Sequence, residues 1–182
     1  MIDKKLEEKI LNLFNNPSTK IEGFNLLVET YKQTIYFQIR RILITHESTD
    51  DVLQEVFIKI WNNLHKFKSK ALLSSWIYRI AYNESLMWIR KNKKKHEFEV
   101  ETLHPSSEPK TNIFSKNADQ ISVLLEKAII RLPNKQKMVF QLKYFEDLNY
   151  KEIQEITGGS VGGLKATYHH AVKKIKLFLE ED

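Results

Sequence analysis

The chain has 182 residues, of which 42% are hydrophobic and 29% are charged, and it carries a net charge of +6 with no cysteine. This composition is typical of a folded globular protein and excludes a wholly disordered chain, and the lack of cysteine excludes disulfides and thiolate metal sites. No segment has the pattern of a signal peptide or reaches the ~18 apolar residues of a membrane span, so we expect a cytoplasmic protein without membrane insertion.

The positive charge is concentrated in one segment. Residues 66–96 contain nine lysines and arginines against one acidic residue, Glu84, together with five aromatic residues. Cations bind phosphates and aromatic faces stack on unpaired bases, so this mixture favours single-stranded or melted nucleic acid as a ligand. The alternative is that the aromatic residues belong to the core and that the lysines of residues 91–95 form a solvated helix end.

Apolar residues at helical spacing predict the helices of a first domain, residues 1–96. We expect one helix over residues 23–44, a second whose apolar stripe covers residues 52–64, and a third over residues 72–94. The alternation that marks a strand is missing, so no sheet is expected.

The second of these helices has its own start signals. Ser48 or Thr49 can cap it, and Asp50 and Asp51 lie in its first turn, where carboxylates interact favourably with the helix dipole. These residues predict that the helix begins just after Thr49.

The stretch over residues 97–117 differs from the rest of the chain. It contains two of the four prolines and several serines and has little periodicity, which is typical of a flexible linker. A second helical domain then covers residues 118–182. It is small, so a neighbouring domain or a partner is expected to help hold it.

Within the second domain, helices are expected from Pro133 to about residue 145 and over residues 150–156, with a break at residues 146–149. Four of the five glycines then fall between Gly158 and Gly163. We expect Gly158 to supply a positive φ at the bend and Ser160 to cap a helix over residues 161–179.

Helix, tight glycine turn and helix form the helix-turn-helix pattern. Leu164, Ala171 and Ile175 are spaced to pack inward, while the second helix has no acidic residue before Glu180. Such a helix enters the major groove of DNA with its N-terminal part and meets phosphate near its end. The alternative is an αα-hairpin with a solvated basic face. The polar residues of this helix are Lys165, Thr167, Tyr168, His169, His170, Lys173, Lys174 and Lys176.

The sequence contains no complete pattern of a catalytic or metal-binding site. Gly158 and Gly163 have the spacing of a phosphate loop, but Leu164 and Lys165 follow in place of Lys and Ser or Thr. His169 and His170 are adjacent and point about 100° apart on a helix, so they do not share a metal ion. No nucleophile, base and orienting group can be assembled. We therefore expect no enzyme activity, cofactor or metal.

The order of these features resembles the extracytoplasmic-function (ECF) subfamily of sigma-70 RNA polymerase sigma factors, and in particular members from Bacteroidetes-like bacteria. Residues 50–61 are similar to the helix of region 2 that binds core polymerase. Residues 75–83 and 88–91 are similar to the part of region 2 that melts and reads the minus-ten element. The helix-turn-helix of region 4, which reads the minus-thirty-five element, is matched by residues 132–136, 150–153 and 160–165.

This resemblance implies three sets of site residues. Binding of core polymerase is expected at Asp51, Gln54, Glu55, Phe57 and Ile58. Binding of minus-ten DNA is expected at Trp76, Tyr78, Arg79, Tyr82, Asn83, Arg90, Lys91 and Lys93. Binding of minus-thirty-five DNA is expected at Ser160, Lys165, Thr167, Tyr168, His169 and Lys173.

The resemblance also implies partners. These are the clamp helices and the flap of core RNA polymerase, promoter DNA and an anti-sigma factor, which many relatives have. The chain departs from the family pattern at Met87, Gln154, Thr167 and Val172. Thr167 and Val172 stand where arginine is common, which predicts weaker or differently specified base contacts, because arginine reads guanine with two hydrogen bonds.

Two other classes of protein share part of this pattern. A stand-alone helix-turn-helix regulator is more often a symmetric dimer that reads a palindrome, and it does not need the basic, aromatic first domain. A helical adaptor explains the apolar stripes but not the placement of the lysines and glycines. Stoichiometric binding to core polymerase separates a sigma factor from both.

Overall fold

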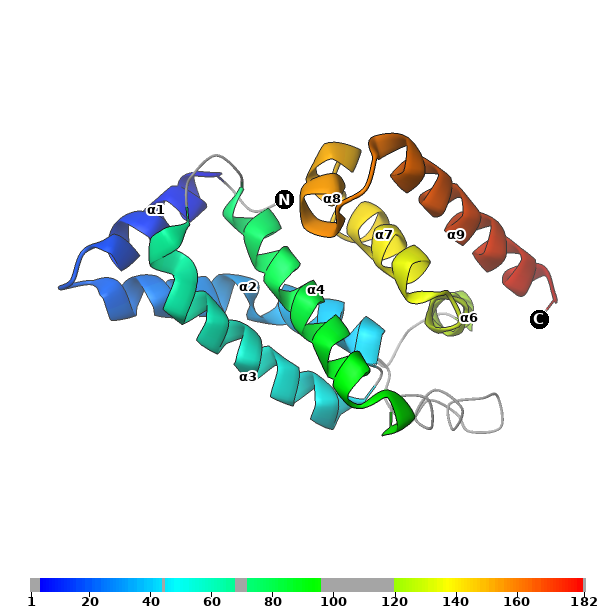
Figure 1. Ribbon diagram of the computed structural model, residues 1–182, viewed down its shortest axis with the longest axis horizontal. Coiled ribbons are helices and arrows are strands. Elements are labelled where there is room, and N and C mark those ends of the chain that lie inside the picture. Colours follow the sequence, from blue (N-terminus) through cyan, green and yellow to red (C-terminus); the bar gives the residue numbers. More distant parts are fainter. Residues whose placement is uncertain (1–3, 44, 68–71, 96–119, 182) are drawn as a thin grey trace.

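The computed structural model describes residues 4–43, 45–67, 72–95 and 120–181, which are helical apart from short turns (Figure 1). No strand occurs among these residues, and the prediction of an all-α chain with two helical domains is confirmed. The predicted linker, residues 97–117, lies outside the described residues. The first domain consists of α1 (Lys4–Asn15), α2 (Lys20–Leu43), α3 (His46–Asn63), the short 3-10 helix η1 (Leu64–Lys66) and α4 (Leu73–Lys91). The second consists of α6 (Gln120–Ile130), α7 (Asn134–Tyr144), α8 (Tyr150–Thr157) and α9 (Val161–Glu181).

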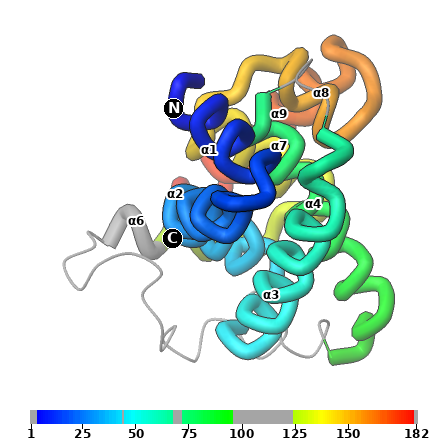
Figure 2. The backbone as a smooth tube through the Cα atoms, turned by 90° about the vertical axis from the view of Figure 1, so that its left-hand side faces the viewer, coloured from blue at the N-terminus to red at the C-terminus, as the bar shows by residue number. Residues whose placement is uncertain are grey.

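Helix α2 is the centre of the first domain, since α1, α3 and α4 all pack against it (Figure 2). Tyr31 and Ile35 of α2 and Val56 and Ile60 of α3 are fully buried, as their helical spacing predicts. Helices α3 and α4 lie side by side, joined by an ion pair of 2.6 Å between Lys59 Nζ and the Glu84 carboxylate. The outer face of α4 is therefore left toward solvent.

The start of α3 differs from the prediction. Thr45 occupies the N-cap position in an extended conformation, and Ser48 and Thr49 lie inside the helix with their side chains buried. The Thr49 hydroxyl donates to the Thr45 carbonyl at 2.6 Å. The prediction of a cap at Ser48 or Thr49 is wrong because a hydroxyl in the first turn can bond back to the carbonyl four residues earlier and so fit inside a helix.

Helix α1 was not among the expected elements, although its apolar residues have helical spacing. Its apolar side chains Ile10 and Phe14 stand one turn apart and are buried against α2. The two helices approach closely at Gly23, where a Cβ would lie 2.5 Å from the Phe14 nitrogen. Only glycine permits this contact.

The helix-turn-helix is formed as the glycines predict. Gly158 and Gly159 have φ values of +73° and +87°, and the Ser160 hydroxyl oxygen accepts the Gly163 N–H at 3.1 Å at the start of α9. The predicted inward residues of α9, among them Leu164 and Ala171, are buried. The prediction of a bend at Gly158 and a cap at Ser160 is confirmed.

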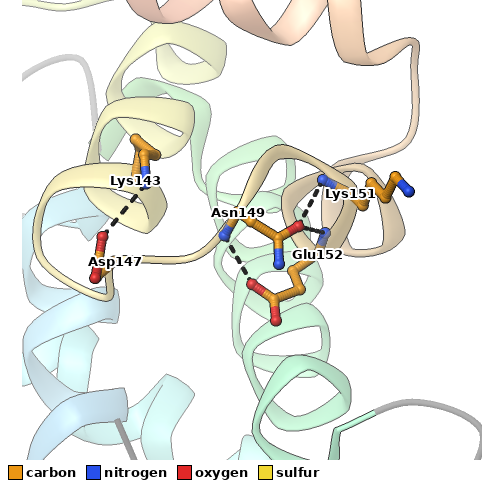
Figure 3. Close-up of polar contacts among 5 residues, drawn as sticks. All are labelled: Lys143, Asp147, Asn149, Lys151 and Glu152. Carbon is orange, nitrogen blue, oxygen red and sulfur yellow. Dashed lines mark hydrogen bonds and ion pairs between the residues drawn. The ribbon is translucent and has the colours of Figure 1, made fainter.

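The predicted break before α8 is a capped turn (Figure 3). The Asn149 side-chain oxygen accepts the N–H groups of Lys151 and Glu152 at 3.0 and 3.1 Å, and the Glu152 carboxylate accepts the Asn149 N–H at 2.7 Å. Asp147 has φ +49° and pairs with Lys143 at 3.3 Å. This reciprocal capping box fixes where α8 begins.

The two domains pack against one another. Helix α8 lies beside the N-terminal half of α4, and the end of α2 meets α6 and α7 (Figure 1). One apolar cluster contains buried side chains of both domains, including Tyr31 of α2 and Leu148 and Ile153 of the second domain. In the described part of the chain, none of the helices has the length and apolar character needed to cross a membrane.

Candidate nucleic-acid interface

One face of α4 carries four of the eight predicted minus-ten residues. Trp76, Arg79, Asn83 and Arg90 follow one another at three-, four- and seven-residue steps, which return to the same side of a helix. Arg79, Asn83 and Arg90 are exposed, and Trp76 is half-buried against the Phe67 ring, with ring centroids 5.5 Å apart. The face therefore combines two guanidinium groups, an amide and an aromatic ring on one rigid helix.

The opposite side of α4 anchors the helix in the core. Ile77, Ala81 and Ser85 are buried, and the Ser85 hydroxyl donates to the Ala81 carbonyl at 2.8 Å. Lys91 and Lys93 are exposed at the C-terminal end, where cations also interact favourably with the helix dipole. Because Glu84 is paired with Lys59, the only acidic residue of the basic segment is neutralised.

Tyr78 and Tyr82 lie off this face. Tyr78 is only 5% exposed, and its hydroxyl donates to the Glu146 carboxylate of the second domain. Burial, followed by the nearby Glu146, raises the pKa of Tyr78, so the phenol stays protonated. Tyr82 is half-buried, and burial raises its pKa against an opposing effect of Arg90. In this arrangement the Tyr78 side chain is covered and is not part of the exposed face of α4.

In the second domain, Lys165, His169 and Lys173 form an exposed row along α9, each one turn from the next. The other predicted residues on this element are occupied within the fold. The Ser160 hydroxyl caps α9, and the Thr167 hydroxyl donates to the Gly163 carbonyl at 2.8 Å. Of the predicted residues on this helix, those of the row are the ones whose side chains are exposed and make no hydrogen bond within the described part of the chain.

Tyr168 belongs to the interior of the second domain. Its ring stacks on Phe140 at a centroid distance of 5.8 Å and meets Tyr150 edge-on at 6.4 Å. Lys165 Nζ lies 5.9 Å from the centroid of the same Tyr150 ring. Lys165 therefore lies over the Tyr150 ring, and the Tyr150 ring in turn packs against Tyr168.

The predicted polymerase-binding residues also divide into exposed side chains and one that packs inside the domain. Asp51, Gln54, Glu55 and Ile58 are exposed on one face of α3, and Ile58 is an apolar side chain with 52% exposure. Phe57 turns toward α2, where its ring meets Phe24 edge-on at 6.4 Å.

An aromatic cluster next to this face was missed by the sequence reasoning. Trp61 packs edge-on against Phe14 at 5.5 Å and Phe24 at 4.9 Å, and Lys20 Nζ lies 4.8 Å over the Trp61 ring. The cluster joins α1, α2 and α3. The apolar stripe of α3 contained Trp61, but its partners come from helices whose packing could not be read from spacing.

The domain contact contains charged residues that were also missed. The Arg41 guanidinium lies 3.8 Å over the Phe145 ring. Burial lowers the pKa of Arg41, whereas Glu146 and Glu126 raise it. Burial likewise raises the pKa of the Glu146 and Glu126 carboxyls. Arg41 opposes this shift at Glu146, and Arg40, followed by Arg41, opposes it at Glu126. The contact therefore brings two arginines, Arg40 and Arg41, to two carboxylates in a partly desolvated site.

No group of three or more histidines, cysteines, aspartates or glutamates that could hold a metal ion occurs in the ranges that the structure covers. The adjacent rings of His169 and His170 are 6.1 Å apart and tilted by 64°.

Comparison with known proteins gives the same two domains. Residues 27–95 match the family model Sigma-70 region 2, and residues 122–175 match Sigma-70, region 4. The chain is 34% identical over 131 residues to RNA polymerase sigma factor SigZ of Bacillus subtilis (strain 168), covering 72% of each protein. It is 29% identical over 171 residues to ECF RNA polymerase sigma factor SigW of the same strain, covering 88% of this chain and 90% of SigW.

Two solved structures share the fold. The sigma factor RpoE in complex with the anti-sigma factor NepR from Bartonella quintana gives a TM-score of 0.71 at 18% identity, covering 87% of this chain and 98% of the matched chain. CnrH in complex with the cytosolic domain of CnrY gives a TM-score of 0.68 at 17% identity, covering 99% and 98%.

The structure has two packed helical domains, with a basic, aromatic helix face in the first and a helix-turn-helix in the second. The family matches identify this combination as that of a sigma factor. The chain belongs to the RNA polymerase sigma factor family. Within that family its relatives and both domain matches identify it as an ECF sigma factor.

Proposed function

We propose that this sigma factor directs core RNA polymerase in the cytoplasm to promoters through two DNA contacts, one in each domain. The observation that carries the proposal is the face of α4 on which Arg79, Asn83 and Arg90 are exposed beside the half-buried Trp76. Its guanidinium, amide and aromatic groups suit the phosphates and bases of an unpaired DNA strand. The helix-turn-helix belongs to the other domain. The stand-alone regulator is not favoured by the family matches.

At the minus-ten element, Trp76 stacks on an extruded base while the Asn83 amide bonds its edge. Arg79, Arg90 and the lysines at the end of α4 hold the phosphates. Because these contacts exist only with the unpaired strand, they shift the duplex toward opening. Tyr78 joins this set when the second domain leaves α4. The chain performs no covalent step and is not an enzyme.

At the minus-thirty-five element, the exposed row of α9 enters the major groove. Lys165 and His169, near the start of the helix, meet base edges, and Lys173 meets phosphate. The row contains no arginine, so readout of guanine rests on lysine, a point charge without the planar fork of arginine.

Core polymerase is bound at two places in this proposal. The exposed face of α3, with Gln54, Glu55 and Ile58, docks on the clamp helices, and the second domain docks on the flap. We assign the domain boundaries as residues 1–96 and 118–182, with residues 97–117 as the tether. A tether raises the effective concentration of the second DNA contact once the first has formed.

An anti-sigma factor is proposed as a further partner. One solved structure with this fold is a sigma factor in complex with an anti-sigma factor, and the other is CnrH in complex with the cytosolic domain of CnrY. An assignment to the Bacteroidetes-like group of ECF sigma factors stays a proposal, supported by the pattern of residues 164–174.

Binding to core polymerase tests the proposal against its rivals. Purified core and this chain are mixed and separated by size, and the complex is analysed for stoichiometry. We expect one chain per core and no dimer of the free chain. A dimer that binds a palindromic duplex and ignores core polymerase would establish the regulator in its place.

A further inference from the structure

The start of α4 is held by a residue from a different helix. Glu7 of α1 is 5% exposed, and its carboxylate accepts the backbone N–H groups of Leu73 and Ser74 at 2.9 and 3.0 Å. It also accepts the Tyr31 hydroxyl at 2.9 Å. Three donors from two other helices thus converge on one buried carboxylate.

Helix α4 depends on this contact because it has no side-chain cap of its own. Its N-cap residue is Leu72, whose side chain has no oxygen that could accept the first N–H groups of the helix. Unpaired N–H groups at a buried helix start are destabilising, and a negative charge there interacts favourably with the helix dipole. Glu7 supplies both the acceptor atoms and the charge.

Tyr31 fixes the carboxylate in place. Burial raises the pKa of Tyr31, and the neighbouring Glu7 raises it further, so the phenol stays protonated and donates its hydrogen. Tyr31 is itself fully buried in α2. The carboxylate is therefore held by the central helix of the domain while it holds the start of α4.

Little else links α1 to α4. A groove lies between α1 and the start of α4, lined on one side by Glu8 and Asn12 and on the other by Phe67 and Leu72. Helix α1 packs mainly on α2. It also lies outside residues 27–95, the part of the chain that matches region 2.

We propose that Glu7 is a positioning residue for promoter opening. It sets the start of α4 so that Trp76, three residues beyond Leu73, and Arg79 meet the unpaired strand in one fixed orientation. This inference rests on the proposed function of α4. The contact from α1 lowers the conformational cost of capturing the strand, because a preorganised helix start does not have to be ordered on binding.

The test uses holoenzyme assembled from core polymerase and the full chain. Glu7→Gln keeps the size of the side chain but removes the charge and one acceptor. Glu8→Gln is the matched control, since Glu8 is the exposed neighbour on the same helix. Leu72→Asp in the Glu7→Gln background supplies a local cap at a residue that already has the extended conformation of an N-cap.

Three quantities are measured for each variant: affinity for core polymerase, affinity for a duplex minus-thirty-five fragment, and affinity for a single-stranded non-template oligonucleotide of the minus-ten region. We expect Glu7→Gln to weaken strand binding about tenfold, the size of effect typical of a lost helix cap, and to leave the other two affinities within about twofold. Glu8→Gln leaves all three unchanged, and Leu72→Asp restores most of the strand binding.

Each other result overturns the inference in a distinguishable way. If wild-type holoenzyme does not bind the strand, the proposed function fails. If it binds and Glu7→Gln binds equally well, Glu7 has no positioning role. If Glu7→Gln loses all three affinities together, or if the local cap at residue 72 restores nothing, Glu7 supports the fold in general rather than the start of α4.

Discussion

Replacing Arg41 with alanine should separate the two domains of the free chain. The guanidinium lies 3.8 Å over the Phe145 ring at the domain contact, and it faces Glu146 and, together with Arg40, Glu126. A desolvated cation–π contact is worth about 2 kcal/mol, and removal of the arginine also takes away a cation that faces the partly buried Glu146, while Arg40 still faces Glu126. A loss of about 2 kcal/mol changes the ratio of packed to separated chains about 30-fold.

Fluorescence energy transfer between the domains measures this ratio. Since the chain has no cysteine, dyes can be attached to cysteines introduced at two exposed positions, Asn62 on α3 and Lys174 on α9. We expect Arg41→Ala to lower the transfer efficiency at low salt without changing helix content. The matched control is Arg131→Ala, which removes an arginine that lies 4.4 Å over the Phe178 ring within the second domain.

The control variant should keep the parental transfer efficiency, because its cation–π contact does not join the domains. If Arg41→Ala keeps the parental efficiency, the arginine does not hold the contact together. Equal losses in both variants would show that the signal reports damage to the second domain instead.

Three further predictions concern a buried lysine and two groups of exposed residues. Lys137 of α7 is buried, and burial lowers its pKa to about 8. Above that pH the folded chain has released a proton that the unfolded chain still binds, so the free energy of unfolding rises with pH above about 8. Lys137→Met should therefore stabilise the chain by about 2 kcal/mol near neutral pH in urea unfolding, with a smaller gain near pH 10, and a gain independent of pH would contradict this. Gln54→Ala combined with Glu55→Ala should weaken core binding about tenfold with the fold intact, since both side chains are exposed; an unchanged affinity in a pull-down would remove the assignment. Lys165→Ala or His169→Ala should cost about 1–3 kcal/mol at some promoters and little at others, whereas an equal loss at every promoter would argue against base readout.

Local patterns were enough to predict the elements that depend on local structure. The apolar stripe of α3 and the turn at Gly158 follow from helical spacing and from the freedom of glycine at positive φ, and both are present. The cap of α3 at Thr45 was missed because Ser48 and Thr49 offer the same hydroxyl chemistry a few residues later.

Contacts between distant residues could not be predicted. Glu7 counted only as one of several charges near the N-terminus, because its partners at Leu73 and Ser74 lie more than sixty residues away. The burial of Tyr78 likewise depends on Glu146 of the second domain. Spacing places Tyr78 on α4, but it does not show which domain covers it.

Run-off transcription tests the central claim most directly. Core polymerase from a related bacterium transcribes fragmented genomic DNA with and without this chain, and the transcript starts are mapped. We predict discrete new start sites that share two upstream elements, one for each domain, and loss of those starts when Arg79 and Asn83 are both replaced by alanine. Transcription that is unchanged by the chain, together with specific DNA binding in the absence of polymerase, would contradict the account.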